Sequence, residues 1–272
     1  MRRASLLIYA IVFIQLSSCF GQDQIKKKQL EKNPAENEYL VQATLWYQRS
    51  AEMRACYYQT FNLAKMVLDD KLMRIRLSKP AAIVFDIDET LLDNSPFETE
   101  TIRTGKDYSK EFWMEWTAME KARELPGAVD FVNHARDKGV EVFYISNRYH
   151  DELTETINNL KKHGFPNVDT SHVLLRKNES DKTSRRNIVS ENHTIVMLVG
   201  DNLTDFSQEF ANRGEDLGFS LVDEKKFEFG STFIVLPNPM YGEWVKAING
   251  NRYDLSDEEK DSRRKEMLFG FE

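Results

Sequence analysis

Cysteine, histidine clusters and long apolar runs are all scarce in this chain of 272 residues. Its two cysteines, Cys19 and Cys56, form no C-x-x-C pair and no cluster with histidine, which excludes the usual zinc-binding patterns. The formal net charge of -7 argues against a nucleic acid polymer as a partner, because a phosphate backbone attracts basic surfaces. The apolar run at residues 6–16 is too short to span a bilayer, which takes roughly 20 residues.

The N-terminal residues are typical of an export signal. Two arginines precede the apolar run, as in a signal peptide, and we expect residues 1–21 to be one. The segment "LSSC", which ends at Cys19, resembles a bacterial lipobox, in which the cysteine is lipidated and becomes the mature N-terminus. Ordinary cleavage after Gly21 is the alternative. The protein is therefore expected to be exported, either anchored by lipid to the bacterial outer membrane or else periplasmic or secreted. Both routes leave only Cys56, so no intramolecular disulfide can form.

The remaining chain divides into a tether, a helical segment, a core and a tail. Residues 22–36 are polar and charged and are expected to form a tether. Residues 37–79 contain apolar side chains at helical spacing with no Gly or Pro, and predict a helical segment. The core is predicted over residues 80–250. Residues 251–272 form a charged tail, expected to be a peripheral helix or a frayed end.

The predicted core alternates short apolar segments with helical ones. The apolar segments lack polar alternation, as expected for strands that are covered on both faces. Two of the helical segments between them end at Gly139 and Gly164, and glycine is a common C-cap. This alternation predicts an α/β fold with a doubly wound parallel sheet. The predicted strands are residues 81–86, 140–146, 172–176, 194–201 and 232–237.

One segment does not follow the alternation. Residues 94–125 are polar and aromatic, and they separate the first predicted strand from the next helix. We expect this insertion to form a smaller, mainly helical cap domain over the site.

Polar side chains follow four of the predicted strands. Ligands of open parallel sheets bind beyond the carboxyl ends of the strands, so these side chains are expected to converge on one edge. The set offers carboxylates for a hard cation and hydroxyl, amide and lysine groups for an anion, which is the composition of a phosphate-plus-magnesium site. Its members are Asp86, Asp88 and Thr90; Ser146, Asn147 and Arg148; Lys182; and Asp201, Asn202 and Asp205.

Charge assigns a role to each of these groups. Mg²⁺ held by the carboxylates would screen the repulsion between them and a phosphate monoester. Asp86 could then attack phosphorus to give an aspartyl-phosphate. Asp88 is placed to protonate the leaving alkoxide and later to deprotonate the hydrolytic water, and an acidic optimum is expected. Lys182, Ser146 and Asn147 would supply charge and hydrogen bonds to the phosphate oxygens.

Four sequence motifs resemble those of the haloacid dehalogenase superfamily. "DIDET" follows the first predicted strand like motif I, and the others are "YISNR" (144–148), "DKTSRR" (181–186) and "GDNLTDF" (200–206). Together with "FIVLPNPMYGEW" (233–244), they are similar to class C acid phosphatases. These are bacterial lipoprotein enzymes, some of which act as 5′-nucleotidases.

The resemblance implies a role for each matching residue. Asp86 would be the nucleophile and Asp88 the acid and base. Asp86, the main-chain carbonyl of Asp88 and the side chain of Asp201 would ligate Mg²⁺, and Asp205 would hold metal-bound water. The phosphate would be held by Ser146, Asn147 and Lys182.

The resemblance also implies a place for the rest of the substrate. The family stacks the substrate's ring on aromatic side chains, which here would be Trp113 and Tyr241, with Trp116 nearby. All three could instead be packing residues of the cap. Lys177 is the alternative to Lys182 as the lysine of the third motif.

The sequence thus predicts an exported, Mg²⁺-dependent acid phosphatase that acts on small phosphate monoesters, with 5′-nucleotides as candidate substrates. A dehalogenase is disfavoured because a leaving halide needs no proton from Asp88, whereas a phosphomutase is harder to exclude. The alternative from another class is a surface ligand- or haem-binding lipoprotein on the same fold, which would not need the catalytic set. The expected partners are small phosphomonoesters and, through a lipid anchor, a membrane. The oligomeric state is open, and a homodimer is compatible with the sequence.

Overall fold

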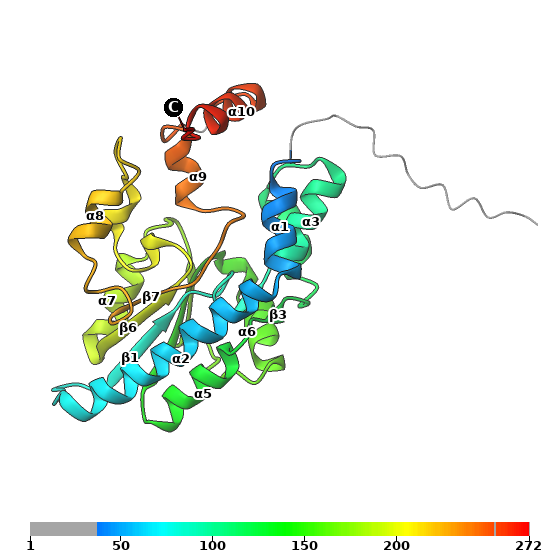
Figure 1. The fold of residues 1–272 in the computed structure, drawn as a ribbon. Coiled ribbons are helices and arrows are strands. Elements are labelled where there is room, and N and C mark those ends of the chain that lie inside the picture. The colour runs from blue at the N-terminus through cyan, green and yellow to red at the C-terminus, as the bar shows by residue number, and fades with distance from the viewer. Residues whose placement is uncertain (1–36, 253, 272) are drawn as a thin grey trace, which may run out of the picture. The chain divides into compact units, whose positions relative to one another are not determined.

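The computed structural model describes residues 37–252 and 254–271 (Figure 1). These residues fall within one structural unit, residues 33–272. The predicted signal peptide with Cys19 and the predicted tether 22–36 lie outside the described residues. Among the helices that are described, none combines the length and the apolar character that crossing a membrane requires.

A five-stranded parallel sheet forms the centre of the core. Its strand order is β5-β4-β1-β6-β7, and every pairing is parallel. Each of the five predicted strands is present, which confirms the α/β fold with a doubly wound parallel sheet. The strands are β1 (Ala81–Phe85), β4 (Glu141–Tyr149), β5 (Val173–Arg176), β6 (Thr194–Gly200) and β7 (Phe233–Val235).

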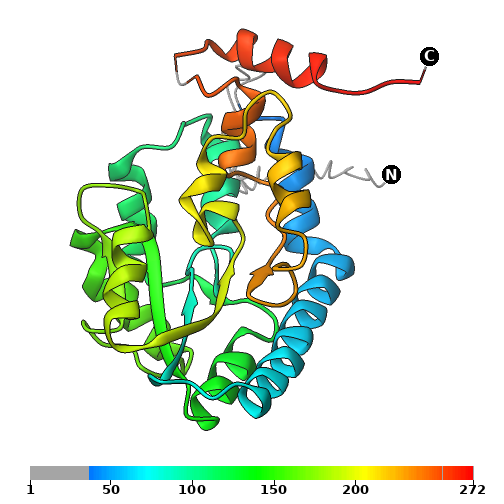
Figure 2. The same cartoon turned by 90° about the vertical axis from the view of Figure 1, so that its left-hand side faces the viewer.

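Helices cover both faces of this sheet because its strands are apolar on both sides. Ile83 and Phe85 of β1 belong to the larger apolar cluster, whereas their neighbours Ala82 and Val84 belong to the smaller one. Figures 1 and 2 show α2 and α5 running along the same side of the sheet. The larger cluster includes residues of α2 (Ala51–Arg74), α5 (Ala128–Asp137) and α6 (Leu153–Lys162), and the smaller includes residues of α7 (Thr183–Asn192), η2 (Leu203–Asp205) and η3 (Gln208–Ala211).

The N-terminal helical segment is two helices rather than the continuous one that the periodicity predicts. α1 (Leu40–Arg49) is followed by Ser50, whose backbone is extended, and α2 begins at the next residue. The Ser50 hydroxyl accepts a hydrogen bond from the Met53 N–H at 3.0 Å and so caps α2. This break lets α2 pack on the sheet while α1 contacts α3 of the cap.

The predicted cap insertion folds as two helices on a short two-stranded base. α3 (Ser95–Thr104) and α4 (Lys110–Thr117) form the helical part. Below them, β2 (Leu92–Asp93) pairs antiparallel with β3 (Arg123–Glu124). Strands of two residues carry no readable periodicity, which explains why the sequence predicted a mainly helical cap without this strand pair.

Short elements complete the chain. The charged tail contains a helix, α10, whose N-terminus is closed by a capping box between Ser256 and Glu259. The Arg264 guanidinium lies 4.0 Å from the centre of the Tyr39 ring, which connects the tail to the start of the described region. The remaining helices are η1 (His150–Glu152), α8 (Phe219–Glu224), α9 (Glu243–Ile248) and α10 (Asp257–Glu266).

Candidate active site

The turn after β1 places two aspartates in the same cavity. Asp86 follows the last residue of the strand, and its N–H still donates to the Val199 carbonyl of β6 at 2.8 Å. Glu89 then adopts a left-handed backbone with φ of 54°, and its carbonyl oxygen accepts a hydrogen bond from the Tyr57 hydroxyl. The chain therefore reverses tightly, and both Asp86 and Asp88 line one cavity. Burial, with the nearby Asp88, raises the pKa of Glu89 well above its usual value.

Three carboxylates converge from two loops at this edge of the sheet. Ligand oxygens of Asp86, Asp201 and Asp205 all lie within 4.8 Å of one another. Asp201 directly follows β6, and its Oδ2 accepts a hydrogen bond from Asn238 Nδ2 at 2.8 Å. Gly200 is required just before it, since a Cβ at that position would lie 2.6 Å from the Cβ of Asp205. The absence of a side chain at Gly200 thus allows Asp205 to fold back toward the other two.

Lys182 lies among these carboxylates at the start of α7. Its Nζ contacts Asp86 Oδ1 and lies 2.7 Å from Asp205 Oδ1. Burial alone would lower the pKa of Lys182, but Asp205 and Asp86 outweigh it and raise the pKa, so the lysine is charged. The alternative lysine, Lys177, is exposed and does not line the cavity. The structure therefore places Lys182 where the third motif requires a cation.

The carboxyl groups of this cluster have raised pKa values. Burial, with additional repulsion from Asp205 and Asp88, raises the pKa of Asp86 to about 7 although Lys182 opposes the shift. Burial and the charges of Asp205 and Asp86 also raise the pKa of Asp201 well above its ordinary value. With all three carboxylates ionised, the single ammonium of Lys182 would leave an excess of two negative charges in the cluster.

This donor set fits a divalent cation. Oxygen ligands suit hard ions such as Mg²⁺, and a double positive charge would balance the excess negative charge. The three carboxylates that could hold the ion are three of the four metal-binding residues predicted from the sequence. The fourth, Asp88, directs its side chain to other partners, and the predicted role of its main-chain carbonyl stays a prediction.

Asp88 is held by three donors. Its Oδ2 accepts a hydrogen bond from Ser146 Oγ at 2.9 Å, and its Oδ1 accepts from Asn94 Nδ2 at 2.8 Å and from Arg148 Nε at 2.9 Å. Only 17% of the Asp88 side chain is exposed, so these contacts fix its direction in the cavity wall. A carboxyl that must meet a leaving group needs this kind of orientation.

The second motif lies on an irregularity of β4. Ser146 pairs with Leu175 of β5, but the next paired residue is Tyr149, so two residues are left without partners in the ladder. Asn147 is thereby exposed to the cavity, and its Oδ1 accepts a hydrogen bond from Arg185 Nη2 at 2.7 Å. Ser146 is fully buried and its hydroxyl donates to Asp88, so its predicted contact with phosphate stays a prediction.

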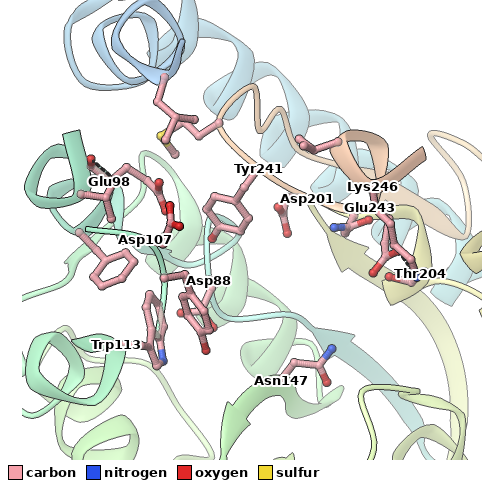
Figure 3. Close-up of a pocket in the computed structure, with 18 of the residues that line it drawn as sticks. Asp88, Glu98, Asp107, Trp113, Asn147, Asp201, Thr204, Tyr241, Glu243 and Lys246 are labelled. Atoms are coloured by element: carbon pink, nitrogen blue, oxygen red, sulfur yellow. Dashed lines mark hydrogen bonds and ion pairs between the residues drawn. The ribbon is translucent and has the colours of Figure 1, made fainter. Parts of the chain in front are cut away.

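The cavity above the aspartates has a volume of about 700 Å³, much more than a phosphate group needs. Figure 3 shows Asp88, Asn147, Asp201 and Tyr241 around it. Trp113 of α4 and Tyr241 before α9 both line the cavity, as the predicted stacking requires. Trp116 does not; its Nε1 donates to Asn94 Oδ1 at 2.9 Å and its ring packs against the core.

Sequence reasoning missed the residues that support this site. Arg148, Arg185, Asn94 and Asn238 hold Asp88, Asn147 and Asp201, but none was given a role. All four lie inside or beside the recognised motifs, and Arg148 was noted among the polar residues that follow the second strand. Asn94 follows its partner Asp88 closely in the chain, whereas the partners of the other three lie on distant segments, so only the fold brings those three pairs together.

Taken together, these features define a capped α/β fold in which a carboxylate cluster that could hold a cation adjoins a buried lysine. The family model of the HAD superfamily, subfamily IIIB (acid phosphatase), matches residues 10–244. The chain is also similar to the class C acid phosphatase from Bacillus anthracis, with 40% identity, a TM-score of 0.83 and coverage of 87% of this chain and 99% of that one. A second structure of a class C acid phosphatase from Bacillus anthracis, with tungstate bound, is 41% identical with a TM-score of 0.82, covering 86% and 98% of the two chains.

More distant similarity extends to plant proteins. A stem 31 kDa glycoprotein of Glycine max is 27% identical over 168 residues, which are 58% of this chain and 58% of that protein. Acid phosphatase 1 of Solanum lycopersicum is 27% identical over 166 residues, which are 58% of this chain and 57% of that protein. The match to these relatives thus spans less than two thirds of their length. This chain belongs to the HAD superfamily, subfamily IIIB, the acid phosphatases.

Proposed function

We propose that this protein is a Mg²⁺-dependent acid phosphatase that hydrolyses small phosphate monoesters through an aspartyl-phosphate on Asp86. One observation carries the proposal: Asp86 and Asp88 open into the same cavity, and Asp86 also belongs to a carboxylate cluster that contains Lys182. This arrangement supports different roles for the two aspartates. Asp86 lies with the other carboxylates and Lys182, as a nucleophile beside a cation site would, whereas the side chain of Asp88 is oriented by its own hydrogen-bond donors, as a general acid would be.

In the first step, an Oδ atom of Asp86 attacks phosphorus, and the bond from phosphorus to the leaving oxygen breaks. Asp88 donates its proton to that oxygen, so the product leaves as a neutral alcohol. Lys182 and the amide of Asn147 stabilise the charge that develops on the phosphoryl oxygens. A bound Mg²⁺ would neutralise carboxylate and phosphate charge and keep Asp86 ionised.

In the second step, water attacks the phosphorus of the intermediate. Asp88 accepts a proton from the water, and the bond from phosphorus to the Asp86 oxygen breaks. Inorganic phosphate is released, and the Asp86 carboxylate and the Asp88 carboxylic acid are both regenerated. The two steps balance with water as the only co-reactant.

We propose that 5′-nucleotides are among the substrates. The cavity extends well beyond the aspartates, and aromatic side chains from the cap and from the segment before α9 line it. Tungstate is an oxyanion, as phosphate is, and its binding to the similar Bacillus anthracis protein supports an anion site in this fold. Stacking of a base on Trp113 and Tyr241 would then hold the nucleoside portion.

This proposal predicts a loss of nucleotide preference when an aromatic wall is removed. Tyr241→Leu should lower kcat/KM for adenosine 5′-monophosphate relative to ribose 5-phosphate by about tenfold, since stacking of one base contributes roughly 1–3 kcal/mol. Phosphate release from both substrates measures the ratio. The matched control is Tyr58→Leu, an exposed tyrosine of α2 that does not line the cavity and should leave the ratio unchanged. An unchanged ratio in Tyr241→Leu would remove this tyrosine from substrate recognition.

Measuring phosphate release also distinguishes a phosphatase from a surface ligand- or haem-binding lipoprotein on this fold. A pure binding protein would bind phosphomonoesters or haem without releasing phosphate from any of them. Measurable release from p-nitrophenyl phosphate in the presence of Mg²⁺ supports the phosphatase. Absence of release over a range of pH and metal concentration would favour the binding protein.

We further propose that the protein is exported and anchored through lipidated Cys19. The support is the sequence pattern of residues 1–21, since these residues lie outside the described structure. Expression of the full chain in a bacterial host with an intact lipoprotein pathway should give a mature protein whose mass begins at Cys19 with acyl chains attached. Cys19→Ala should abolish that modification. A mature N-terminus after Gly21 would show ordinary cleavage instead, and an uncleaved chain would contradict export.

A further inference from the structure

Arg148 is a buried cation whose contacts reach from the catalytic aspartate to the cap. Its side chain is only 1% exposed. Nε donates to Asp88 Oδ1 at 2.9 Å, and Nη2 lies 2.9 Å from the same oxygen. Nη1 donates to Thr156 Oγ1 of α6 at 3.2 Å, and Nη2 also donates to Asn94 Oδ1 at 3.4 Å. The guanidinium carbon also lies 5.9 Å from the centre of the Trp113 ring in the cap.

This set of contacts fixes the guanidinium on three sides. α6 supports it from the core through Thr156, and Asn94, at the base of the cap, supports it from the other direction. Asn94 also donates to Asp88 Oδ1 at 2.8 Å, so the arginine and the asparagine hold the same carboxylate oxygen. The planar fork of arginine can make these bonds at once, whereas the single ammonium of lysine cannot.

We propose that Arg148 is a positioning residue that orients the Asp88 carboxyl toward the leaving oxygen. Through its contact with Trp113, it also couples this orientation to the cap. The inference rests on the proposed function, because it assigns Arg148 a part in the proton transfer by Asp88. Arg148 itself would touch neither phosphorus nor the leaving group. Its removal should therefore affect the step in which the leaving group needs a proton, and leave phosphate binding nearly intact.

Leaving groups of different acidity provide the test. A p-nitrophenolate leaves without a proton, whereas an alkoxide needs one, and kcat/KM reports the step in which the leaving bond breaks. Arg148→Lys should lower kcat/KM for an alkyl phosphate about 100-fold but for p-nitrophenyl phosphate by no more than about fivefold, because general acid catalysis contributes roughly 10²–10⁴-fold. Thr156→Val, which removes only the Nη1 acceptor, should show the same pattern with a smaller loss.

Arg185→Lys is the matched control. Arg185 is also a buried arginine beside β4, but it donates to the Ser146 carbonyl and to Asn147 Oδ1, and within the described part of the chain it makes no hydrogen bond to Asp88. Its substitution should lower kcat/KM for both substrates by the same factor. Equal losses for both substrates in Arg148→Lys as well would overturn the proposal and make Arg148 a structural residue.

Chemical rescue covers the case in which the lysine variant folds poorly. Guanidinium at millimolar concentration should restore the alkyl phosphatase activity of Arg148→Ala more than its p-nitrophenyl phosphatase activity. Rescue of both to the same extent would contradict the positioning role.

The link to the cap predicts that losses of kcat/KM from Trp113→Leu and Arg148→Lys are not additive for the alkyl substrate. Additive losses would show that Trp113 and Arg148 act independently.

Asp88→Asn separates this inference from the proposed function. If Asp88 is the general acid, this variant should itself show a much larger loss for the alkyl phosphate than for p-nitrophenyl phosphate. A leaving-group dependence in Asp88→Asn without one in Arg148→Lys would reject the arginine's role alone. The lack of any such dependence in Asp88→Asn would reject the proposed acid, and the inference about Arg148 with it.

Discussion

Asp86→Asn is expected to lower kcat for every phosphate monoester by at least about 10⁴-fold, as the loss of a nucleophile typically does. The amide cannot form the bond to phosphorus that the carboxylate forms, and no other carboxylate of the cluster follows β1 directly. Phosphate release from p-nitrophenyl phosphate at saturating Mg²⁺ measures the effect. Turnover at the wild-type rate would exclude Asp86 as the nucleophile.

The fold of this variant should be intact, and the pH dependence of its stability provides the control. The pKa of Asp86 is raised by burial from 3.8 to about 7, so ionising it in the metal-free folded protein is unfavourable. Wild-type stability should therefore fall as the pH rises from 3.8 toward 7, because the unfolded chain loses this proton first, and then level off. Asp86→Asn lacks that penalty. In thermal unfolding without metal, the stability of Asp86→Asn relative to the wild type should increase from pH 3.8 to about 7, and the difference should vanish at lower pH. If the variant were unfolded instead, its loss of activity would reflect the fold and not the missing nucleophile.

Removal of the metal is expected to have the second large effect. EDTA should abolish phosphate release, and added Mg²⁺ should restore it, because the three clustered carboxylates, once ionised, outnumber the one lysine among them. Asp201→Asn should raise the Mg²⁺ concentration needed for half-maximal activity at least about 100-fold, given that even residues that only support a ligand contribute 10–100-fold to metal affinity. Titration of the EDTA-treated protein with Mg²⁺ measures both effects.

Asp137→Asn is the control for the metal titration. Asp137 is an exposed carboxylate of α5 that pairs with Arg136 and does not line the cavity, so its loss changes net charge by the same amount as Asp201→Asn. Its Mg²⁺ requirement should equal that of the wild type. Full activity in EDTA would contradict a metal-dependent mechanism, and an equal shift in both variants would reduce the Asp201 effect to general electrostatics.

The sequence predicted the parts of this molecule that depend on local pattern. Buried strands show as apolar runs, so all five strands of the sheet were recognisable, and their carboxyl ends indicated where Asp86, Asp201 and Lys182 would meet. The motifs were also predicted to meet at one edge of the sheet, because parallel strands bring the residues that follow them to the same edge.

The sequence could not predict features that depend on contacts between distant segments. Ser50 divides the N-terminal helix because its hydroxyl accepts a single backbone N–H, a choice that helical periodicity does not reveal. The orientation of Ser146 toward Asp88 and the reach of Arg148 across to Asn94 depend on the irregularity in β4. A short strand pair at the base of the cap likewise has too few residues to show a period.

Trapping the covalent intermediate would show whether Asp86 is the residue that bonds to phosphorus. Asp88→Asn removes the base for the second step, whereas p-nitrophenyl phosphate needs no acid in the first, so phosphoenzyme should accumulate in this combination. Acid quenching followed by borohydride reduction converts a phosphoaspartate to homoserine, which peptide mass spectrometry locates. Homoserine is expected at position 86 only when substrate has been added. Phosphate release that continues with an unmodified position 86, or homoserine at another aspartate, would contradict it.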